Sequence, residues 1–403
     1  MDRYKSFFRG IAYAGYCIVF LFAVYTFEKS IPDQIYVKAG EAIDYRFQVP
    51  VTMEIQEDSS PVAKSTNNAN VRQSYIVTCR LFGIFPVKDI EVILVYGDAV
   101  YAGGMPIGIY VKTSGVLVIG TSEVERPDGS EAAPAENILK AGDYILSVNG
   151  EKVAEKEDLQ RLVQQNGAEK EILKINRKGE EVEVGVTPVQ NKNGTYMLGA
   201  WVRDDLAGIG TLTYYKEDGT YGALGHAVSD GDVGERIQMR EGYVYNAQII
   251  GVKKGQKGNP GELSGMIRYQ SADCLGTIEE NTDIGIYGKL DGNIAALPRG
   301  DYYNICYKQD IKQGPATIIC GFTGEKKEYA IEIESLDYSG REANKGILFR
   351  VTDEQLLDMT GGIVQGMSGS PILQDGKIIG AVTHVFVSDS SMGYGIFIEN
   401  MVE

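Results

Sequence analysis

The stretch Gly361–Ile372, which reads GGIVQGMSGSPI, decides how the rest of the chain is interpreted. Gly366 and Gly369 flank a serine, Ser368, and Pro371 follows shortly after. Glycine allows a backbone to approach another group closely, and proline fixes the direction in which a turn ends. Such a turn is either plain structure or a support that presents a nucleophilic serine beside two backbone N–H donors. The remainder of the chain has to distinguish these two interpretations.

The composition predicts a mainly β protein with more than one domain. The chain has 403 residues, of which 43% are hydrophobic, which suggests two to four domains with cores of their own. Its 49 glycines and 12 prolines suit short strands joined by tight turns. A formal net charge of −16 argues against a nucleic-acid partner.

The cysteines do not suggest a metal site. None of the five forms a CxxC pair, so we expect no zinc, no other metal and no cofactor. Outside the cytoplasm, four of them allow three disulfide pairings, and buried free thiols are the alternative. These four are Cys79, Cys274, Cys306 and Cys320.

The N-terminus carries an uncharged apolar run, Ile11–Phe27, preceded by three basic residues. A membrane-spanning helix needs roughly 20 mostly apolar residues, and a positive flank keeps that end in the cytoplasm. Bulky residues at Phe22–Thr26 do not suit a signal-peptidase site. We therefore predict a cytoplasmic tip and uncleaved anchor over residues 1–30, with everything after it exported.

Short alternating runs over residues 31–99 predict a small β domain or spacer without visible chemistry. The next unit, residues 100–190, is similar to PDZ domains, through the phrase ILKAGDYILSVNGEKV at Ile138–Val153 and the order of its parts. Its Asn149-Gly150 pair is a strong hairpin signal. A helix follows, with Leu159, Leu162 and Val163 on one face.

In PDZ domains, the loop before the second strand receives the end of a peptide, which adds as an extra strand. The resemblance places this loop in a glycine-rich segment, and it implies a peptide-binding role there. The alternative is a closed PDZ domain that only packs against its neighbour. The loop residues are Gly104, Met105, Pro106, Ile107, Gly108 and Ile109.

Residues 191–403 are rich in strand and turn patterns, which predicts a barrel-type architecture. A serine needs a base to take its proton, and only two histidines are present. His226 lies in LGHAVSD, after a strand and among small residues, and is the better candidate. His384 lies inside the strand AVTHVFV beside the predicted site, where it would contact substrate. A third member must orient the imidazole; the candidates are Asp230, Asp353, Glu354 and Asp358.

The motif GMSGSPI resembles the serine turn of chymotrypsin-like peptidases, which fold as a double β-barrel. Together with the anchor, the PDZ-like unit and GHAVSD, it resembles the SpoIVB peptidase family. That resemblance implies that Ser368 is the nucleophile and His226 the base. It also implies that Asp353, fifteen residues before the serine, is the acid. Asp353 has a competing role as a helix cap in TDEQLLDM. The N–H groups of Gly366 and Ser368 would form the oxyanion hole.

The same resemblance implies an endopeptidase of sporulation signalling that processes itself. Such an enzyme acts between the two membranes around the forespore. It cuts the ectodomain of a membrane regulator, which releases an intramembrane protease for pro-sigma-K. Its expected partners are that protein substrate, its own N-terminal region and the membrane. The alternatives are a general quality-control PDZ protease and a non-catalytic PDZ adapter.

One residue departs from the digestive enzymes. Met367 stands where they carry an aspartate that pairs with a newly cut N-terminus. We therefore expect regulation through the PDZ domain, the anchor or self-cleavage.

Overall fold

The structure is a computed structural model, and it describes Tyr25, Glu28 and residues 31–38, 51–55, 62–64, 72–95, 99–291 and 301–402. In these ranges, no helix combines the length and apolar character that a membrane crossing requires. Apart from Tyr25, the apolar run Ile11–Phe27 lies outside the described residues, so the anchor stays a prediction. The described chain is mainly β, as expected.

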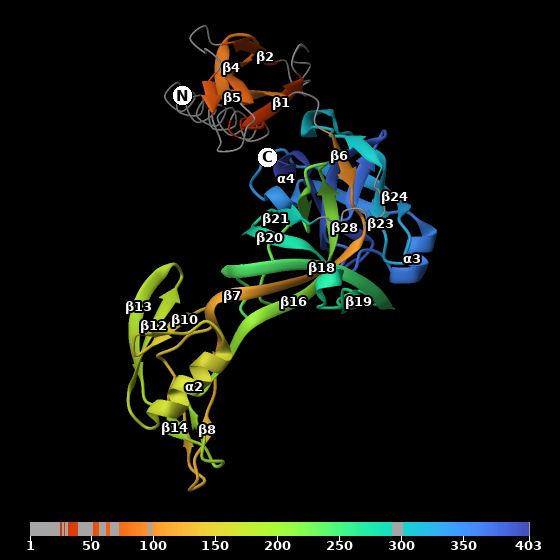
Figure 1. The fold of residues 1–403 in the computed structure, drawn as a ribbon. Coiled ribbons are helices and arrows are strands. Elements are labelled where there is room, and N and C mark those ends of the chain that lie inside the picture. Colours follow the sequence, from red (N-terminus) through yellow and green to blue (C-terminus); the bar gives the residue numbers. More distant parts are fainter. Residues whose placement is uncertain are drawn as a thin grey trace, which may run out of the picture.

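A five-stranded sheet forms the first unit, in the order β1-β5-β4-β2 with β3 beside β4. It lies at one end of the molecule in Figure 1. Its core is a small apolar cluster that includes Ile35, Val77, Ile90 and Val92. The strands are β1 (Gln34–Lys38), β2 (Val51–Ile55), β3 (Val62–Lys64), β4 (Arg72–Leu81) and β5 (Phe85–Val95).

Six strands close into a first barrel, in the order β7-β18-β20-β21-β17-β16 and back to β7. Apolar side chains such as Ile109, Val244 and Ile286 fill its interior. The ring consists of β7 (Pro106–Thr121), β16 (Ala200–Tyr215), β17 (Thr220–Ala223), β18 (Met239–Lys253), β20 (Cys274–Thr282) and β21 (Gly285–Leu290). Outside the ring, β6 (Ala99–Ala102) pairs with β16 and β22 (Tyr302–Asn304), and β19 (Glu262–Ile267) pairs with β18.

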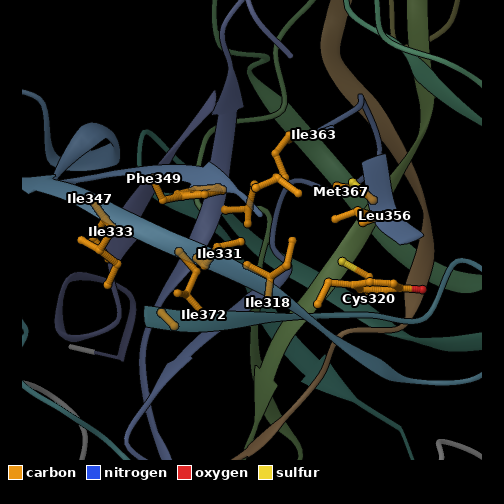
Figure 2. Packing of buried hydrophobic residues seen from close by; sticks show 14 of the residues in the cluster. Ile318, Cys320, Ile331, Ile333, Ile347, Phe349, Leu356, Ile363, Met367 and Ile372 are labelled. Atoms are coloured by element: carbon orange, nitrogen blue, oxygen red, sulfur yellow. The ribbon is translucent and has the colours of Figure 1, made fainter. Parts of the chain in front are cut away.

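A second closed barrel follows in the order β23-β24-β25-β28-β27-β26. Alternate residues of β24 point inwards, and Tyr329, Ile331 and Ile333 are buried, as a strand with one buried face requires. Figure 2 shows part of this core, where Ile318, Ile331 and Ile372 pack together. The strands are β23 (Gly314–Cys320), β24 (Lys327–Leu336), β25 (Ile347–Val351), β26 (Pro371–Gln374), β27 (Lys377–Val385) and β28 (Met392–Phe397). The helices are α3 (Glu354–Thr360) and α4 (Glu399–Val402).

The PDZ domain is inserted into the first barrel, between β7 and β16. These two strands pair with each other from the barrel into the PDZ domain, and Figure 1 shows them as the bridge between the two parts. Leu159, Leu162 and Val163 of the helix are buried, as their spacing predicts. The elements are β8 (Val124–Glu125), β9 (Glu131–Ala132), β10 (Tyr144–Val148), β11 (Glu151–Lys152), α2 (Lys156–Asn166), β12 (Glu171–Arg177), β13 (Glu180–Val186), β14 (Val189–Gln190) and β15 (Tyr196–Met197).

This insertion corrects the predicted boundaries at 100 and 191. The two-barrel part takes β6 and the first half of β7 from before the PDZ domain, so it is discontinuous in sequence. The cause is the long strand β7, whose first half pairs with barrel strands and whose second half pairs with the PDZ strand β10.

The predicted peptide-binding loop, Gly104–Ile109, is also corrected. Ile107 and Ile109 lie within β7, where β18 pairs along one edge and β16 along the other. A strand with both edges occupied has no free N–H and C=O row for an added peptide. A side chain at Gly108 would meet Ile267 of β19 at 2.7 Å, beside the first barrel. A substitution at Gly108 would therefore disturb the first barrel and not the PDZ domain alone.

Candidate active site

The serine turn follows α3 directly. The helix ends at Thr360 and is capped by Gly361, whose φ of 73° is the left-handed value that favours glycine. The N–H of Met367 donates to the carbonyl of Val364 at 3.1 Å, and the N–H of Ser370 donates to Met367 at 2.9 Å. These bonds close a compact loop around Ser368.

Two residues of the turn are explained by packing. A Cβ at position 369 would lie 2.1 Å from the carbonyl oxygen of Thr211 in the first barrel, so only glycine fits there. Met367 is almost completely buried in the core of the second barrel, and Figure 2 shows it beside Leu356 of α3. An apolar anchor therefore holds the turn at the position where digestive enzymes use an aspartate.

His226 reaches the serine turn from the first barrel. It follows β17 through a tight turn in which Gly225 lies against Thr383; a Cβ at Gly225 would be 2.8 Å from that side chain. The ring centroids of His226 and His384 are 5.3 Å apart. Ser368 Oγ donates to the carbonyl of Thr383, the neighbour of His384, at 2.9 Å. The structure thus gathers Ser368, His226 and His384 where the two barrels meet.

The tautomer of His226 suits a general base. Its Nδ1 lies 2.8 Å from the carbonyl of Ala227. Because a carbonyl oxygen only accepts, Nδ1 carries the proton in this bond. Nε2 is then unprotonated and able to take a proton from a serine. No described hydrogen bond joins His226 to Ser368, whose hydroxyl points to Thr383 in this state.

His384 is a neutral ring beside the base. Its Nδ1 is buried and lacks a hydrogen-bond partner within the described ranges. Burial lowers its pKa to about 4, helped by the nearby His226 and Lys345. Burial also lowers the pKa of His226 below the ordinary 6.5, against the opposing effect of its bond to Ala227. His384 therefore stays neutral in mildly acidic solution, and His226 takes up a proton at a lower pH than an ordinary histidine.

These pKa shifts predict the response to pH. Since the base works only when neutral, we expect the acid limb of kcat/KM to have its midpoint below 6.5. An unfolded chain takes up protons at the ordinary pKa, whereas folded His384 resists protonation to about 4. Stability should therefore decrease as the pH falls from about 6.5 towards 4. Rate and melting temperature measured over this range test both statements. An acid limb of kcat/KM centred at or above pH 6.5 contradicts the first.

The two backbone N–H groups predicted to form the oxyanion hole have no hydrogen-bond acceptor in the described structure. Within the described residues, the N–H groups of Gly366 and Ser368 donate no hydrogen bond. Gly366 and Ser368 are half-buried, and two unpaired N–H groups beside a serine are suited to receive the oxygen of a tetrahedral intermediate.

Asp353 is not brought to His226. One of its carboxylate oxygens accepts from the N–H of Leu356 at 2.9 Å and caps α3. The other accepts from the N–H of Ala330 at 3.4 Å. The structure therefore confirms the capping role that competed with the catalytic one. Its assignment as the acid stays a prediction carried by the resemblance, and the carbonyl of Ala227 occupies the place on His226 that the acid would take.

Substitutions of Asp353 separate these roles, because asparagine caps a helix about as well as aspartate but carries no charge. We expect Asp353→Ala to lower the free energy of unfolding by about 1 kcal/mol, and Asp353→Asn to leave it nearly unchanged. Melting curves check this. The assignment as the acid requires in addition that Asp353→Asn lowers kcat roughly 10⁴-fold at an unchanged melting temperature. Near-native turnover in that variant would exclude it.

The other acidic candidates also have separate roles or no bond to His226. Asp230 is completely buried, forms an ion pair with Arg203 of β16, and accepts from the N–H groups of Asp232 and Val233. Glu354 lies in the first turn of α3. Across the described ranges, no carboxylate is hydrogen-bonded to His226.

Metal ligands and disulfides are not found in the described part of the chain. There, no three His, Cys, Asp or Glu side chains are grouped to hold a metal ion. Cys79, Cys274, Cys306 and Cys320 are free thiols. Burial raises the pKa of Cys79 and Cys306 to about 11 and that of Cys320 to about 12, which makes these three unreactive.

Two joined β-barrels, with a histidine from one and a glycine-flanked serine from the other, define a two-barrel serine peptidase. The sequence profile of the SpoIVB peptidase S55 family matches residues 194–402, more than half of the chain, and the protein belongs to this family. A PDZ profile matches residues 127–177, from just after β8 to the end of β12. The chain matched no curated protein. The enzyme is therefore a serine peptidase with a PDZ domain, and its substrates are proteins.

Proposed function

We propose that this peptidase is a membrane-anchored signalling enzyme of sporulation. It processes itself, then cuts the ectodomain of a membrane regulator and so triggers the intramembrane proteolysis of pro-sigma-K. The observation that carries the proposal is the family match, which spans both proposed catalytic residues, His226 and Ser368. The apolar run Ile11–Phe27 and its basic flank support an anchored, exported enzyme with a cytoplasmic N-terminus.

The placement of the PDZ domain supports regulated cleavage over general protein degradation. In quality-control proteases, the PDZ domain usually follows the peptidase barrels. Here it interrupts the first barrel and contacts the loop that follows the base. The N–H of Gln238, in that loop, donates to the hydroxyl of Tyr144 in the PDZ domain at 3.1 Å. Arg203 of β16 pairs with the buried Asp230 of the same loop. Movement of the PDZ domain would therefore act on His226.

The cleavage proposal is tested with the full chain in membranes. Wild type and Ser368→Ala are each incubated with the ectodomain of a membrane regulator and, separately, with unfolded casein. We expect the wild type to shorten its own N-terminal region and to cut the ectodomain at one or a few sites, with little cleavage of casein. Broad digestion of casein would favour the quality-control alternative. Self-shortening that persists in Ser368→Ala would mean that another protease is responsible.

The regulatory proposal is tested by Tyr144→Phe, which removes only the hydroxyl that accepts from Gln238. We expect a folded enzyme whose self-cleavage starts at a different time from that of the wild type. Tyr221→Phe is the matched control. Tyr221 is also a buried tyrosine, but its hydroxyl donates to the carbonyl of Thr277 within the first barrel. Unchanged timing in Tyr144→Phe would contradict the coupling.

A further inference from the structure

Thr211 connects the two barrels at the serine turn. It lies in β16 and is almost fully buried. Its hydroxyl donates to the carbonyl of Gly366 at 2.8 Å. Its backbone N–H donates to the carbonyl of Ser368 at 2.9 Å. The two residues it holds are the same two whose own N–H groups are free.

The bonds around the turn fix each peptide unit separately. In a trans peptide, the C=O and the next N–H lie in one plane and point in opposite directions. The N–H of Leu263 donates to Gln365 at 2.8 Å, which directs the N–H of Gly366 away from β19. The N–H of Ser370 donates to the carbonyl of Met367, and the N–H of Ser368, in the same peptide unit, therefore points away from Ser370. Thr211 holds the two peptide units that follow Gly366 and Ser368.

Gly366 is the weak point of this arrangement. Its φ is +98°, a conformation that glycine adopts easily. Without the hydroxyl of Thr211, the half-buried Gly366 carbonyl would lose its partner, and the peptide could then reorient to pair it elsewhere. The turn has no aspartate salt bridge to prevent this, because Met367 occupies that position.

We propose that Thr211 is a positioning residue for the oxyanion hole. Its hydroxyl holds the Gly366–Met367 peptide, which joins the two donor peptides, and so keeps the N–H groups of Gly366 and Ser368 converging on the oxygen of the tetrahedral intermediate. The inference rests on the assignment of Ser368 as nucleophile and of these two N–H groups as the oxyanion donors. Thr211 touches no reacting atom and acts only through the turn.

Three variants of the full-length enzyme isolate the hydroxyl. Thr211→Val keeps the shape of the side chain and removes the hydroxyl, whereas Thr211→Ser keeps the hydroxyl. Thr213→Val is the matched control on the same strand, because Thr213 is also buried but its hydroxyl has no hydrogen-bond partner among the described residues. For each, we would measure the kcat and KM of p-nitrophenyl ester hydrolysis, the maximal rate of inactivation by a fluorophosphonate, and the melting temperature.

We expect Thr211→Val to lower kcat and the maximal inactivation rate about 10- to 100-fold, somewhat less than removing an oxyanion donor outright. KM should change little, because the ground state does not use the hole. Thr211→Ser should recover most of the rate, and Thr213→Val should behave as wild type.

Wild-type rates in Thr211→Val would overturn the proposal. A loss of kcat that Thr211→Ser does not restore would also overturn it, and so would a loss of kcat explained by a lower melting temperature. Failure of the nucleophile assignment looks different: Ser368→Ala would then still react with the fluorophosphonate.

Discussion

Replacing Ser368 with alanine is expected to abolish peptide hydrolysis while the protein stays folded. Loss of a triad nucleophile lowers kcat on the order of 10⁶-fold. The fold should tolerate the change, because the side chain is only partly buried and makes one hydrogen bond, to the carbonyl of Thr383. Labelling by a fluorophosphonate and cleavage of a protein substrate, measured beside the melting temperature, would check both statements.

Ser370→Ala is the matched control for this experiment. Ser370 lies in the same turn but is buried, and its hydroxyl accepts a hydrogen bond from the thiol of Cys320. It is shielded from substrate, so its loss should leave most activity. Residual activity above a few percent in Ser368→Ala, with host proteases removed, would mean that Ser368 is not the nucleophile. Equal loss in both variants would indicate a damaged turn instead.

Replacing His226 with alanine is expected to be about as damaging, because the members of a catalytic unit act together and their losses are not additive. Its Nε2 is free to take the serine proton, since Nδ1 donates to Ala227. The double variant with Ser368→Ala should therefore be hardly worse than either single variant. Single-turnover reaction with a fluorophosphonate would measure the lost chemical step directly.

His384→Ala provides the comparison, because this ring lies 5.3 Å from His226 but belongs to a strand of the second barrel. We expect it to retain most turnover and to raise the apparent KM for a peptide substrate. If the two histidine variants exchange these results, His384 is the base. If His384→Ala also loses turnover with an unchanged KM, its neutral ring is needed to hold His226 in place.

Local features of the active site were predictable from sequence because they depend on neighbouring residues. A serine between glycines, a proline at the exit and an aspartate before a helix each impose their conformation on a few adjacent peptides. The Asn149-Gly150 hairpin is a further example: both residues have positive φ, at 49° and 83°, as this pair favours. The face formed by Leu159, Leu162 and Val163 follows from helical periodicity in the same way. The capping role of Asp353 also belongs here.

The sequence by itself thus determined the class of enzyme, the serine turn and the histidine candidates. Tertiary structure alone decided which strands share a barrel. Strand pairing depends on partners far along the chain, so nothing local marks β7 as common to both the PDZ domain and the peptidase, and Gly104–Ile109 resembled a loop for that reason. The same applies to Thr211, which lies 155 residues from Gly366. Its role exists only because folding brings the first barrel against the serine turn.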